Sequence, residues 1–365
     1  MASFDEVLKD CTKLGTKIPT SEYLENGKYP IIDQGQNDIA GYYDSDDGLF
    51  EDVPTIVFGD HTRIVKYIDK PCFLGADGVK LLCPVSKDTN CKYLFYQLAH
   101  ADIPNTGYNR HFKWVKALNF KIPSSDEQNH VVEVLDKVTE LISLRKQQLA
   151  RLDELVKARF VEMFGDAKLN PYDFPCNSLS EYILFLTSGS RGWSQYFTDN
   201  GEYFITIKNV KNCRITLQDV QYVIPPDNAE AKRTKVQEND LLISITADLG
   251  RTGVVPKEIA KHGAYINQHL TCIRLNLEKV NPIYVSYYME SDAGKEQFAS
   301  KNQSAVKAGL NFNAINSLKL IVPPLSLQND FAAFVERVDQ QKQTVQQSLE
   351  KLELMKKALM QEYFG

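Results

Sequence analysis

The sequence predicts an α+β protein with two β-rich globular units and two long helices that pair antiparallel as a coiled coil. One stretch occurs twice, over residues 120–165 and 320–365, and landmarks such as Pro123 and Pro323 recur at a constant offset of 200 residues. Each copy carries an apolar stripe with the alternating three-and-four spacing of a coiled-coil seam. Short β-like runs separated by turns fill the rest of the chain. We therefore expect a pseudo-twofold repeat.

The first globular unit is predicted over residues 1–119. Its candidate strands are residues 29–32, 55–58, 64–68 and 79–83, and a short buried helix is expected over 92–99. Asp-Gly, Gly-Asp and Lys-Pro pairs mark the turns between them.

The second globular unit, residues 166–319, repeats this style. Its candidate strands are residues 203–207, 240–245, 252–255 and 270–275, with a short helix over 282–290. Residues 93–98 are similar to residues 284–289, so the two units are expected to share one fold that has diverged.

Residues 120–165 and 320–365 are each predicted to be one long helix. In the first copy, Ser125 or Asp126 can cap the free amides, and Gln128 stands three residues after Ser125 as in a capping box. Gly165 supplies the stop. A helix over 126–163 would be roughly 55 Å long at ~1.5 Å per residue.

The two helices are expected to pair with each other along their apolar stripes. The seam residues are Val131, Leu135, Val138, Ile142, Leu149, Leu152, Val156 and Met163 in the first copy, and Phe331, Val335, Val338, Val345, Leu349, Leu352, Leu359 and Tyr363 in the second. Polar residues interrupt the seam at Arg145, Arg159, Lys342 and Lys356. Leu141 and Leu155 are expected to pack in the core, with docking of partner helices as the alternative.

Composition limits the possible function classes. The seven cysteines are scattered without Cys-x-x-Cys spacing, which indicates reduced thiols in a cytoplasmic protein and argues against a metal site. No apolar run is long enough for a membrane span, and residues 1–10 show no signal-peptide pattern. The net charge of −5 does not favour nucleic-acid binding unless cations gather on one face or partner subunits contribute affinity.

These features closely resemble the specificity subunit of type I restriction-modification enzymes. The resemblance rests on the doubled Pro-x-x-x-x-Gln starts, the Phe-Gly ends at 164–165 and 364–365, and the Gly-x-Asn segments at 107–109 and 309–311. Residues 267–270 and 75–80 also look like parts of that family's target-recognition domains. The resemblance spans the whole chain, although the first unit is a shorter variant than the second.

The resemblance implies a division of labour. Residues 1–119 and 166–319 would be two target-recognition domains that each read half of a split, asymmetric double-stranded DNA target. Residues 120–165 and 320–365 would be spacer helices that set the gap and dock two modification subunits, beside restriction subunits. Catalysis would belong to those partners, which would carry S-adenosylmethionine, ATP and Mg²⁺, and this chain would have no cofactor of its own.

A search for catalytic motifs favours a binding protein. The chain contains neither a phosphate-binding Gly-x-x-x-x-Gly-Lys-Ser/Thr loop nor a Gly-x-Gly-x-x-Gly segment after a strand. Residues 170–172, Asn-Pro-Tyr, are similar to a methyltransferase motif but lack its second proline. The histidines show no zinc spacing, and the run Asp44, Asp46 and Asp47 is typical of a solvated loop.

Candidate DNA contacts in the first unit combine amides, cations and hydroxyls on loops, the groups that read base edges and phosphates. They are Gln34, Gln36, His61, Thr62, Arg63, Lys66, Asn109, Arg110 and Lys113. An ordinary polar loop or turn is the alternative for the first six of these residues.

In the second unit the candidates lie in a glycine-rich loop and in basic clusters. They are Ser190, Arg191, Lys208, Asn209, Lys232, Arg233, Lys235 and Arg251. A solvated charge run is the alternative for 232–235. Trp193 can be a packing anchor, and bonding within a loop is preferred over base contact for residues 267–269.

The sequence thus predicts a non-catalytic DNA-recognition subunit. The alternative is a coiled-coil scaffold or antagonist protein that binds partner subunits without reading DNA.

Overall fold

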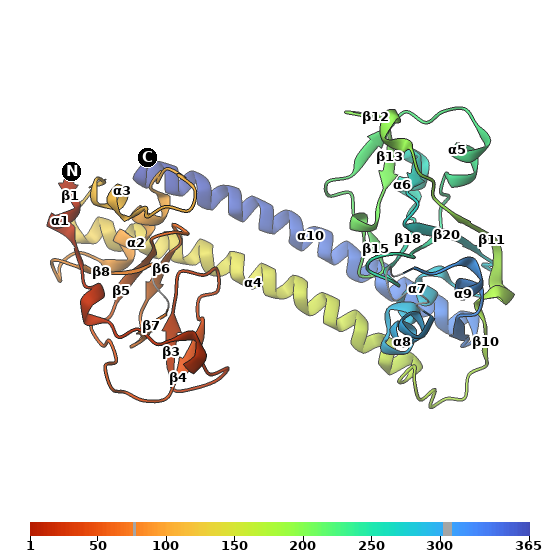
Figure 1. Ribbon diagram of the computed structural model, residues 1–365, viewed down its shortest axis with the longest axis horizontal. Helices are drawn as coiled ribbons and strands as arrows, with labels where there is room; N and C mark the ends of the chain where they lie inside the picture. Colours follow the sequence, from red (N-terminus) through yellow and green to blue (C-terminus); the bar gives the residue numbers. More distant parts are fainter. Residues whose placement is uncertain (76–77, 302–308) are drawn as a thin grey trace. The chain divides into compact units, whose positions relative to one another are not determined.

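The computed structural model divides the chain into two compact units. It describes residues 1–75, 78–301 and 309–365. Unit 1 comprises Met1–Gln148 and Val345–Gly365, and unit 2 comprises Leu149–Thr344. Each unit therefore contains one globular part and segments of both long helices, α4 (Ser125–Phe164) and α10 (Leu325–Phe364), which Figure 1 shows in yellow and blue.

Short strands and helices precede α4 in unit 1. They are β1 (Ala2–Ser3), α1 (Phe4–Val7), β2 (Leu8–Asp10), η1 (Thr12–Leu14), η2 (Thr20–Glu22), β3 (Tyr29–Ile32), β4 (Gly41–Tyr43), β5 (Thr55–Gly59), β6 (Val65–Ile68), β7 (Phe73–Leu74), β8 (Val79–Pro84), α2 (Cys91–His100), α3 (Phe112–Lys116) and β9 (Asn119–Phe120). The strands and the helix that the sequence predicts for this unit are confirmed within one residue at each end.

The main sheet of unit 1 is buried on both faces. Its antiparallel order is β2-β8-β5-β6, and a smaller sheet, β4-β3-β7, has β3 and β7 parallel. Successive residues of β5 alternate between two cores, as the period of a strand requires. Ile56 and Phe58 pack toward the helices, whereas Val57 packs with residues of the small sheet such as Leu74.

Unit 2 is richer in short elements. They are β10 (Cys176–Ser178), η3 (Leu179–Tyr182), β11 (Ile183–Ser188), η4 (Trp193–Tyr196), β12 (Phe197–Thr198), β13 (Glu202–Ile205), η5 (Ile207–Asn209), β14 (Val210–Lys211), β15 (Arg214–Ile215), β16 (Gln221–Val223), α5 (Ala229–Thr234), β17 (Leu241–Ser244), β18 (Thr252–Val254), α6 (Lys257–His262), β19 (Ala264–Ile266), β20 (Leu270–Leu275), α7 (Pro282–Glu290), α8 (Asp292–Lys301), α9 (Phe312–Asn316) and β21 (Lys319–Ile321). The four strands and the helix predicted for this unit are present.

The globular part of unit 2 has the same topology as that of unit 1. Its main sheet has the order β11-β20-β17-β18, and its second sheet pairs β13 with β16 antiparallel and with β19 in parallel. These strands correspond in order and direction to β2-β8-β5-β6 and to β4-β3-β7. The expectation that one fold occurs twice is therefore confirmed.

A hairpin, β14 with β15, distinguishes unit 2. It lies between β13 and β16, where Val210 pairs with Ile215. The corresponding connection in unit 1, residues 33–40 between β3 and β4, is described throughout and contains no strand. The extra length of the second unit therefore includes a feature that the first unit lacks.

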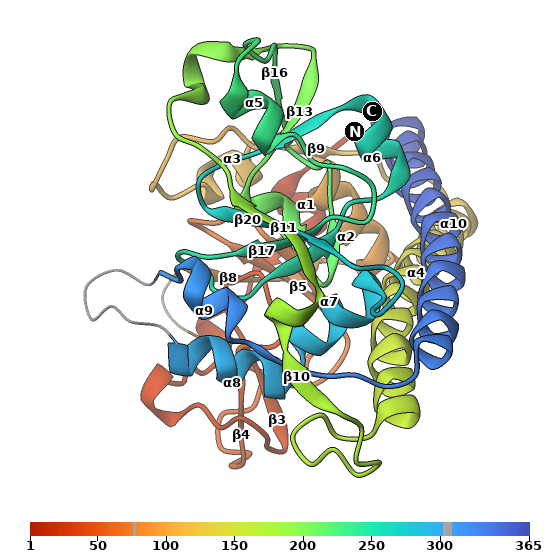
Figure 2. The ribbon, with the colours of Figure 1, turned by 90° about the vertical axis from the view of Figure 1, so that its right-hand side faces the viewer.

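The long helices pair antiparallel in both units, as predicted. In unit 1, Val131 and Leu135 of α4 share a core with Met360 of α10. In unit 2, the ring of Phe160 lies 5.4 Å from that of Phe331, at the other end of α10. Figure 2 shows α7 between the main sheet of unit 2 and the two helices.

Aromatic residues close the last turn of each helix. Phe164 lies 4.7 Å from the ring of Tyr284 on α7, and Phe364 lies 5.3 Å from the ring of Tyr93 on α2. Phe160 and Phe164 are buried more deeply than Met163, which the apolar spacing assigned to the seam. The Phe-Gly ends therefore pack the two long helices against equivalent short helices, α7 and α2, of the globular parts.

Two expectations about α4 are wrong. Ser125 is already helical, and the hydroxyl of Ser124 accepts the bond from Glu127 N at 3.4 Å. Gln128 forms no capping box because α2 buries it; its Oε1 accepts from Asn90 N at 2.9 Å and its Nε2 donates to Pro123 O at 2.9 Å. Gln328, the equivalent residue of α10, makes the same two contacts in unit 2.

The second error concerns Leu141 and Leu155. These side chains are 43% and 48% exposed and do not pack in a core. They stand on the outer faces because the seam is narrow, and apolar residues outside it meet solvent. Among the described residues, no helix is both long and apolar enough to cross a membrane.

Candidate functional site

Three loops of unit 1 converge beside the end of β5, and we call them the first loop cluster: residues 33–37, 59–64 and 104–111. Thr62 Oγ1 donates to Gln34 O at 2.8 Å, and His111 N donates to Asp60 O at 2.8 Å. The buried carboxylate of Asp60 also accepts from Phe112 N at 2.7 Å. Side chains on these loops are therefore held at defined places.

His61 and Tyr108 form the most prominent feature of the first loop cluster. Their rings are stacked, with centroids 4.8 Å apart and an interplanar angle of 10°. The backbone N–H of His61 donates to Gln34 Oε1 at 3.2 Å, which fixes the histidine on its loop. Tyr108 is 89% exposed, so one face of its ring is free for a ligand. The sequence shows Tyr108 as an aromatic residue beside the cations of residues 110–113 but does not predict it as a contact, since its exposure and its stacking partner depend on the fold.

The predicted contacts in unit 1 fall into two groups. Gln36, Thr62, Asn109, Arg110 and Lys113 are exposed, and Gln34, His61 and Arg63 are partly exposed. Lys66 instead is buried, and its ammonium donates to Asn37 O at 2.5 Å and pairs with Asp33 at 3.5 Å. Arg63 Nη1 donates to Ile103 O at 3.0 Å. Lys66 and Arg63 therefore hold the loops together from within.

Unit 2 has an equivalent arrangement, the second loop cluster: residues 188–192, 245–251 and 267–269. Ile245 N donates to His269 O at 3.0 Å, and Thr246 Oγ1 lies 2.6 Å from His269 Nδ1. The preference for loop bonding over base contact in 267–269 is thus supported. In unit 1, Asp60 N donates in the same way to Gly78 O at 2.7 Å. Residues 76 and 77, within the 75–80 stretch, lie outside the described residues.

Close backbone approach shapes the loop that carries Arg191. A Cβ on Gly189 would lie 2.0 Å from the carbonyl oxygen of Asn267, so only glycine fits there. Trp193 is buried and its ring stacks 5.3 Å from that of Phe204, as expected of a packing anchor. Arg191 itself is exposed and makes no side-chain hydrogen bond or ion pair within the described ranges. Its guanidinium is therefore available to a ligand.

Arg233 has a role in positioning this loop. Its guanidinium bonds to the hydroxyl of Thr187, to Ser188 O at 3.0 Å and to Ser190 Oγ at 3.2 Å. The sequence predicted a phosphate contact here, but three of its donors bond to two hydroxyls and one backbone carbonyl of residues 187–190, just before Arg191.

The remaining predicted residues of unit 2 also fall into a free group and a group bonded within the unit. Asn209 is buried, and its amide donates to Thr216 O at 3.1 Å, so it has no free edge for a base. Lys208 is exposed without a partner among the described residues. Lys232 pairs with Asp227 at 2.9 Å on the surface. Lys235 pairs with Glu202 at 2.8 Å, and the hydrogen bond to that carboxylate raises the pKa of the ammonium group.

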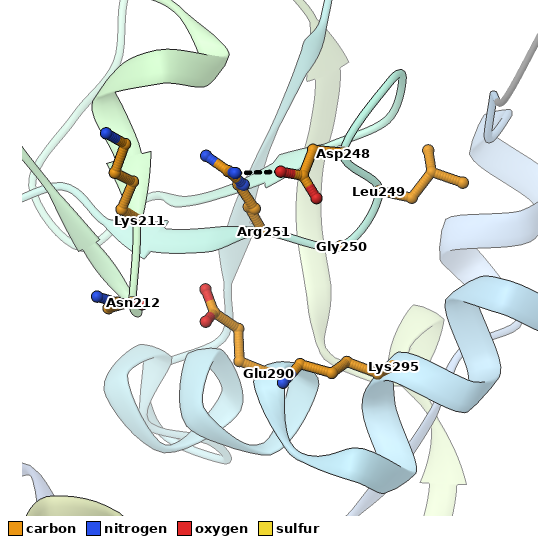
Figure 3. Close-up of a pocket in the computed structure, with 8 residues that line it drawn as sticks. All are labelled: Lys211, Asn212, Asp248, Leu249, Gly250, Arg251, Glu290 and Lys295. Carbon is orange, nitrogen blue, oxygen red and sulfur yellow. Dashed lines mark ion pairs between the residues drawn. The ribbon is translucent and has the colours of Figure 1, made fainter. Parts of the chain in front are cut away.

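A cavity of about 370 Å³ opens beside the second loop cluster (Figure 3). Its lining residues are Lys211, Asn212, Asp248, Leu249, Gly250, Arg251, Glu290 and Lys295. Arg251 pairs with Asp248. Glu290 accepts from Thr252 N at 2.8 Å and from Cys213 N at 3.1 Å, so its charge is partly compensated. Lys211 and Lys295 keep free ammonium groups within the described part of the chain, which suits phosphate.

Residues 170–172 do not form a methyltransferase site. The amide of Asn170 donates to Phe174 O at 2.8 Å and its carbonyl accepts from Phe174 N at 3.1 Å, which closes a local turn. Across residues 1–75, 78–301 and 309–365, no group of three or more His, Cys, Asp or Glu side chains is placed to hold a metal ion. The candidate functional site of each unit is therefore its loop cluster.

The comparisons with known proteins agree in one family. A model of the type I restriction modification DNA specificity domain matches residues 5–154 and 189–354. A type I restriction enzyme specificity subunit of Methanocaldococcus jannaschii is 23% identical, over 95% of this chain and 86% of that protein. A type I restriction enzyme specificity subunit of Escherichia coli is 21% identical, over 88% and 82%.

Solved structures share the fold. The S subunit of a type I restriction-modification system from M. genitalium has a TM-score of 0.61 at 17% identity, covering 100% of this chain and 95% of that chain. A chain from a study of assembly and conformational transition of the type I system has a TM-score of 0.51 at 15% identity, covering 98% and 94%.

Proposed function

Because the chain belongs to the type I restriction-modification DNA specificity family, we propose that it reads a split, asymmetric double-stranded DNA target through its two loop clusters. It acts as the specificity subunit, and modification and restriction subunits perform the chemistry. S-adenosylmethionine, ATP and Mg²⁺ belong to those partners, and the complex works in the cytoplasm.

One observation carries the proposal. The two globular parts have the same sheet order and dock on repeated positions of the long helices, yet their loop clusters carry different side chains. Equal scaffolds place two readers equivalently, and unlike loops read unlike sequences, since base edges are distinguished by the donors and acceptors that meet them. The two half-sites should therefore differ.

We assign roles by exposure. Arg191 and Gln36, which are exposed, contact base edges, where a planar guanidinium pairs with guanine and an amide with adenine. Cations such as Arg110, Lys113 and Lys208 contact phosphates. The bonded residues Lys66, Asn209 and Arg233 position the loops.

The outer faces of the long helices fit the docking of modification subunits. Large apolar side chains exposed there are Leu141, Leu144, Leu155, Val161, Leu354 and Met355. Exposed apolar residues gathered on helices are typical of protein interfaces. Their exposure supports a partner that covers them.

The test is DNA binding by the purified chain in complex with its modification subunits. We expect fluorescence anisotropy to show an affinity that falls linearly with log salt and that drops when either half-site is scrambled. Arg191→Ala should weaken discrimination only at the half-site read by unit 2, by about tenfold or more for a lost bidentate contact. An assembled complex whose affinity for DNA stays the same when either half-site is scrambled would indicate the scaffold alternative instead.

A further inference from the structure

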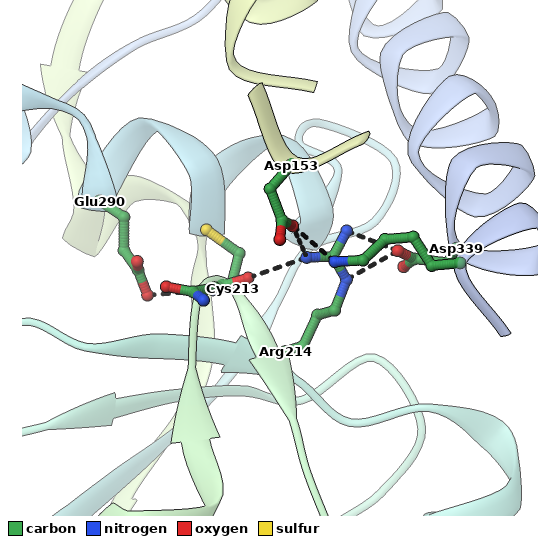
Figure 4. A network of polar contacts seen from close by, with 7 residues as sticks. Asp153, Cys213, Arg214, Glu290 and Asp339 are labelled. Atoms are coloured by element: carbon green, nitrogen blue, oxygen red, sulfur yellow. Dashed lines mark hydrogen bonds and ion pairs between the residues drawn. The ribbon is translucent and has the colours of Figure 1, made fainter. Parts of the chain in front are cut away.

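Arg214, on the β14–β15 hairpin, joins the globular part of unit 2 to both long helices (Figure 4). Its Nε donates to Asp339 Oδ1 on α10 at 2.7 Å, and its Nη1 lies 3.5 Å from Asp153 Oδ1 on α4. Lys342 of α10 bonds to the same oxygen of Asp153 at 2.5 Å. One guanidinium therefore links three elements of unit 2.

The network is partly buried. The side chain of Arg214 is 27% exposed, against 34% for Asp339 and 38% for Asp153. Burial disfavours the charged form of the guanidinium, but its bond to Asp339 and the nearby carboxylates outweigh burial and raise the pKa of Arg214. Without Arg214, Asp339 would lose its ion pair and Asp153 would keep only its bond to Lys342, so the joint should weaken.

Hollow space surrounds this joint. A cavity of about 620 Å³ lies on one side and another of about 600 Å³ on the other. Both are lined by Cys213, Arg214 and Tyr287 together with residues of the long helices. On these two sides the network is therefore flanked by open space and not by closely packed side chains.

A second contact lies at the start of α7. Asn281 N donates to Gln328 Oε1 at 2.9 Å, and its amide donates to Asn329 Oδ1 at 2.9 Å. Unit 1 repeats this contact with Asn90, Gln128 and Asn129. The Arg214 joint supplies an attachment on another element, separate from this contact and from the packing of Tyr284 on Phe164.

Unit 1 achieves its further attachment differently. Lys92 and Tyr96 of α2 both bond to Asp136 of α4, at 2.8 and 2.6 Å. No element of unit 1 within the described ranges corresponds to the β14–β15 hairpin. Among the described residues, the hairpin joint thus belongs to unit 2.

We propose that Arg214 is a positioning residue that fixes the angle of the second recognition domain on its helix segments and so restricts the chain to one gap between half-sites. Neighbouring gaps differ by ~3.4 Å along the DNA and by about 34° of rotation at ~10.5 base pairs per turn. Small tilts of the domain therefore decide whether a neighbouring gap is accepted. This inference rests on the proposed function.

The experiment is methylome sequencing of a host that expresses the full chain, wild type or Arg214→Gln, with its modification subunits. The wild type should methylate one split motif with one gap. Arg214→Gln should methylate the same half-sites but accept gaps one base pair longer or shorter about tenfold more often, which corresponds to ~1.4 kcal/mol, because a partly buried carboxylate loses its partner. Arg214→Lys, which keeps one bond to Asp339, should restore part of the strictness.

Arg274→Gln is the matched control. Arg274 is 30% exposed and forms a similar pair with Asp240, through bonds of 2.9 and 2.8 Å, but both residues belong to the globular part. This variant should lower thermal stability and leave the gap unchanged. If Arg214→Gln does not assemble, Asp339→Asn removes the same bond from the helix side and should broaden the gap likewise.

Three results would overturn the inference. Assembled Arg214→Gln and Asp339→Asn complexes that keep the strict wild-type gap would refute this inference but not the proposed function. Broadening by Arg274→Gln as well would show that any loss of stability loosens the gap. A wild-type complex that methylates no split motif would refute the proposed function, and the inference with it.

Discussion

The ring of Tyr108 is 89% exposed and is nevertheless held by stacking on His61. Because the ring packs against little else, it contributes little to the core. A fixed, exposed aromatic ring in a loop cluster is suited to apolar contact with a thymine methyl group in the groove of double-stranded DNA.

We predict that Tyr108→Ala weakens binding of the target DNA about tenfold, or ~1.4 kcal/mol, because an apolar contact with the DNA is lost. Its thermal unfolding should match that of the wild type. Tyr108→Phe should bind normally. Tyr172→Ala is the control, since Tyr172 is 55% exposed in a turn outside both loop clusters. Wild-type affinity in Tyr108→Ala would remove this residue from the interface.

Gln328 illustrates a buried polar residue with a structural role. It is 0% exposed, and it accepts from Asn281 N while donating to Pro323 O at 2.7 Å. We predict that Gln328→Ala destabilises unit 2 by about 1–3 kcal/mol, because it leaves both backbone groups without their bonds. Denaturant unfolding measures this, with exposed Gln347→Ala as the control. Equal stability of the two variants would contradict this role.

At the scale of elements, the long helices are the part that the sequence predicts best. The seam residues and the stop at Gly165, where φ is +74°, follow from local spacing and conformational preference. The capping box failed at Gln128 because a tertiary contact with Asn90 took its side chain. Local rules could not reveal that partner, which is 38 residues away along the chain.

The loop clusters were predicted only in outline. Exposed cations such as Arg191 and Arg110 are visible as residue types in turns, but Arg233 and Lys66 look the same in sequence and are engaged internally. Which cation is free depends on the loops that converge on it, and these come from distant segments. The joint formed by Arg214 was missed for the same reason.

The length of the long helices should also set the gap between the half-sites. Deleting one heptad from each, residues 143–149 and 343–349, keeps the apolar stripe in phase and removes ~10 Å of helix. We predict that the methylated motif then narrows by about three base pairs at ~3.4 Å each, with both half-sites unchanged. Inserting one heptad at the same places should widen it equally. An unchanged gap would refute the spacer role of the helices.

At the scale of the whole molecule, the repeat is cyclic. Lys121 Nζ donates to Gly365 O at 2.9 Å, and Ala2 pairs with Phe120, so both chain ends lie together in unit 1 (Figures 1 and 2). In unit 2 the equivalent connection is continuous, because residues 166–175 lead from Gly165 into β10.

We predict that a circular permutant folds and recognises the same target. It joins Gly365 to Met1 through a linker copied from residues 166–175 and opens the chain within that original segment. All docking contacts of α2 and α7 are retained, so its thermal unfolding should resemble that of the wild type. A linear chain with the copied linker fused to its C-terminus is the control. Failure of the permutant alone to fold would show that the halves are not interchangeable in connectivity.

The central claim is that one chain carries two different readers at a fixed spacing. Methylome sequencing of a host that expresses this chain with its modification subunits tests it most directly. We predict a new methylated motif made of two unlike half-sites separated by one constant gap. An assembled complex that leaves the methylome unchanged, or methylates a continuous motif, would contradict the account.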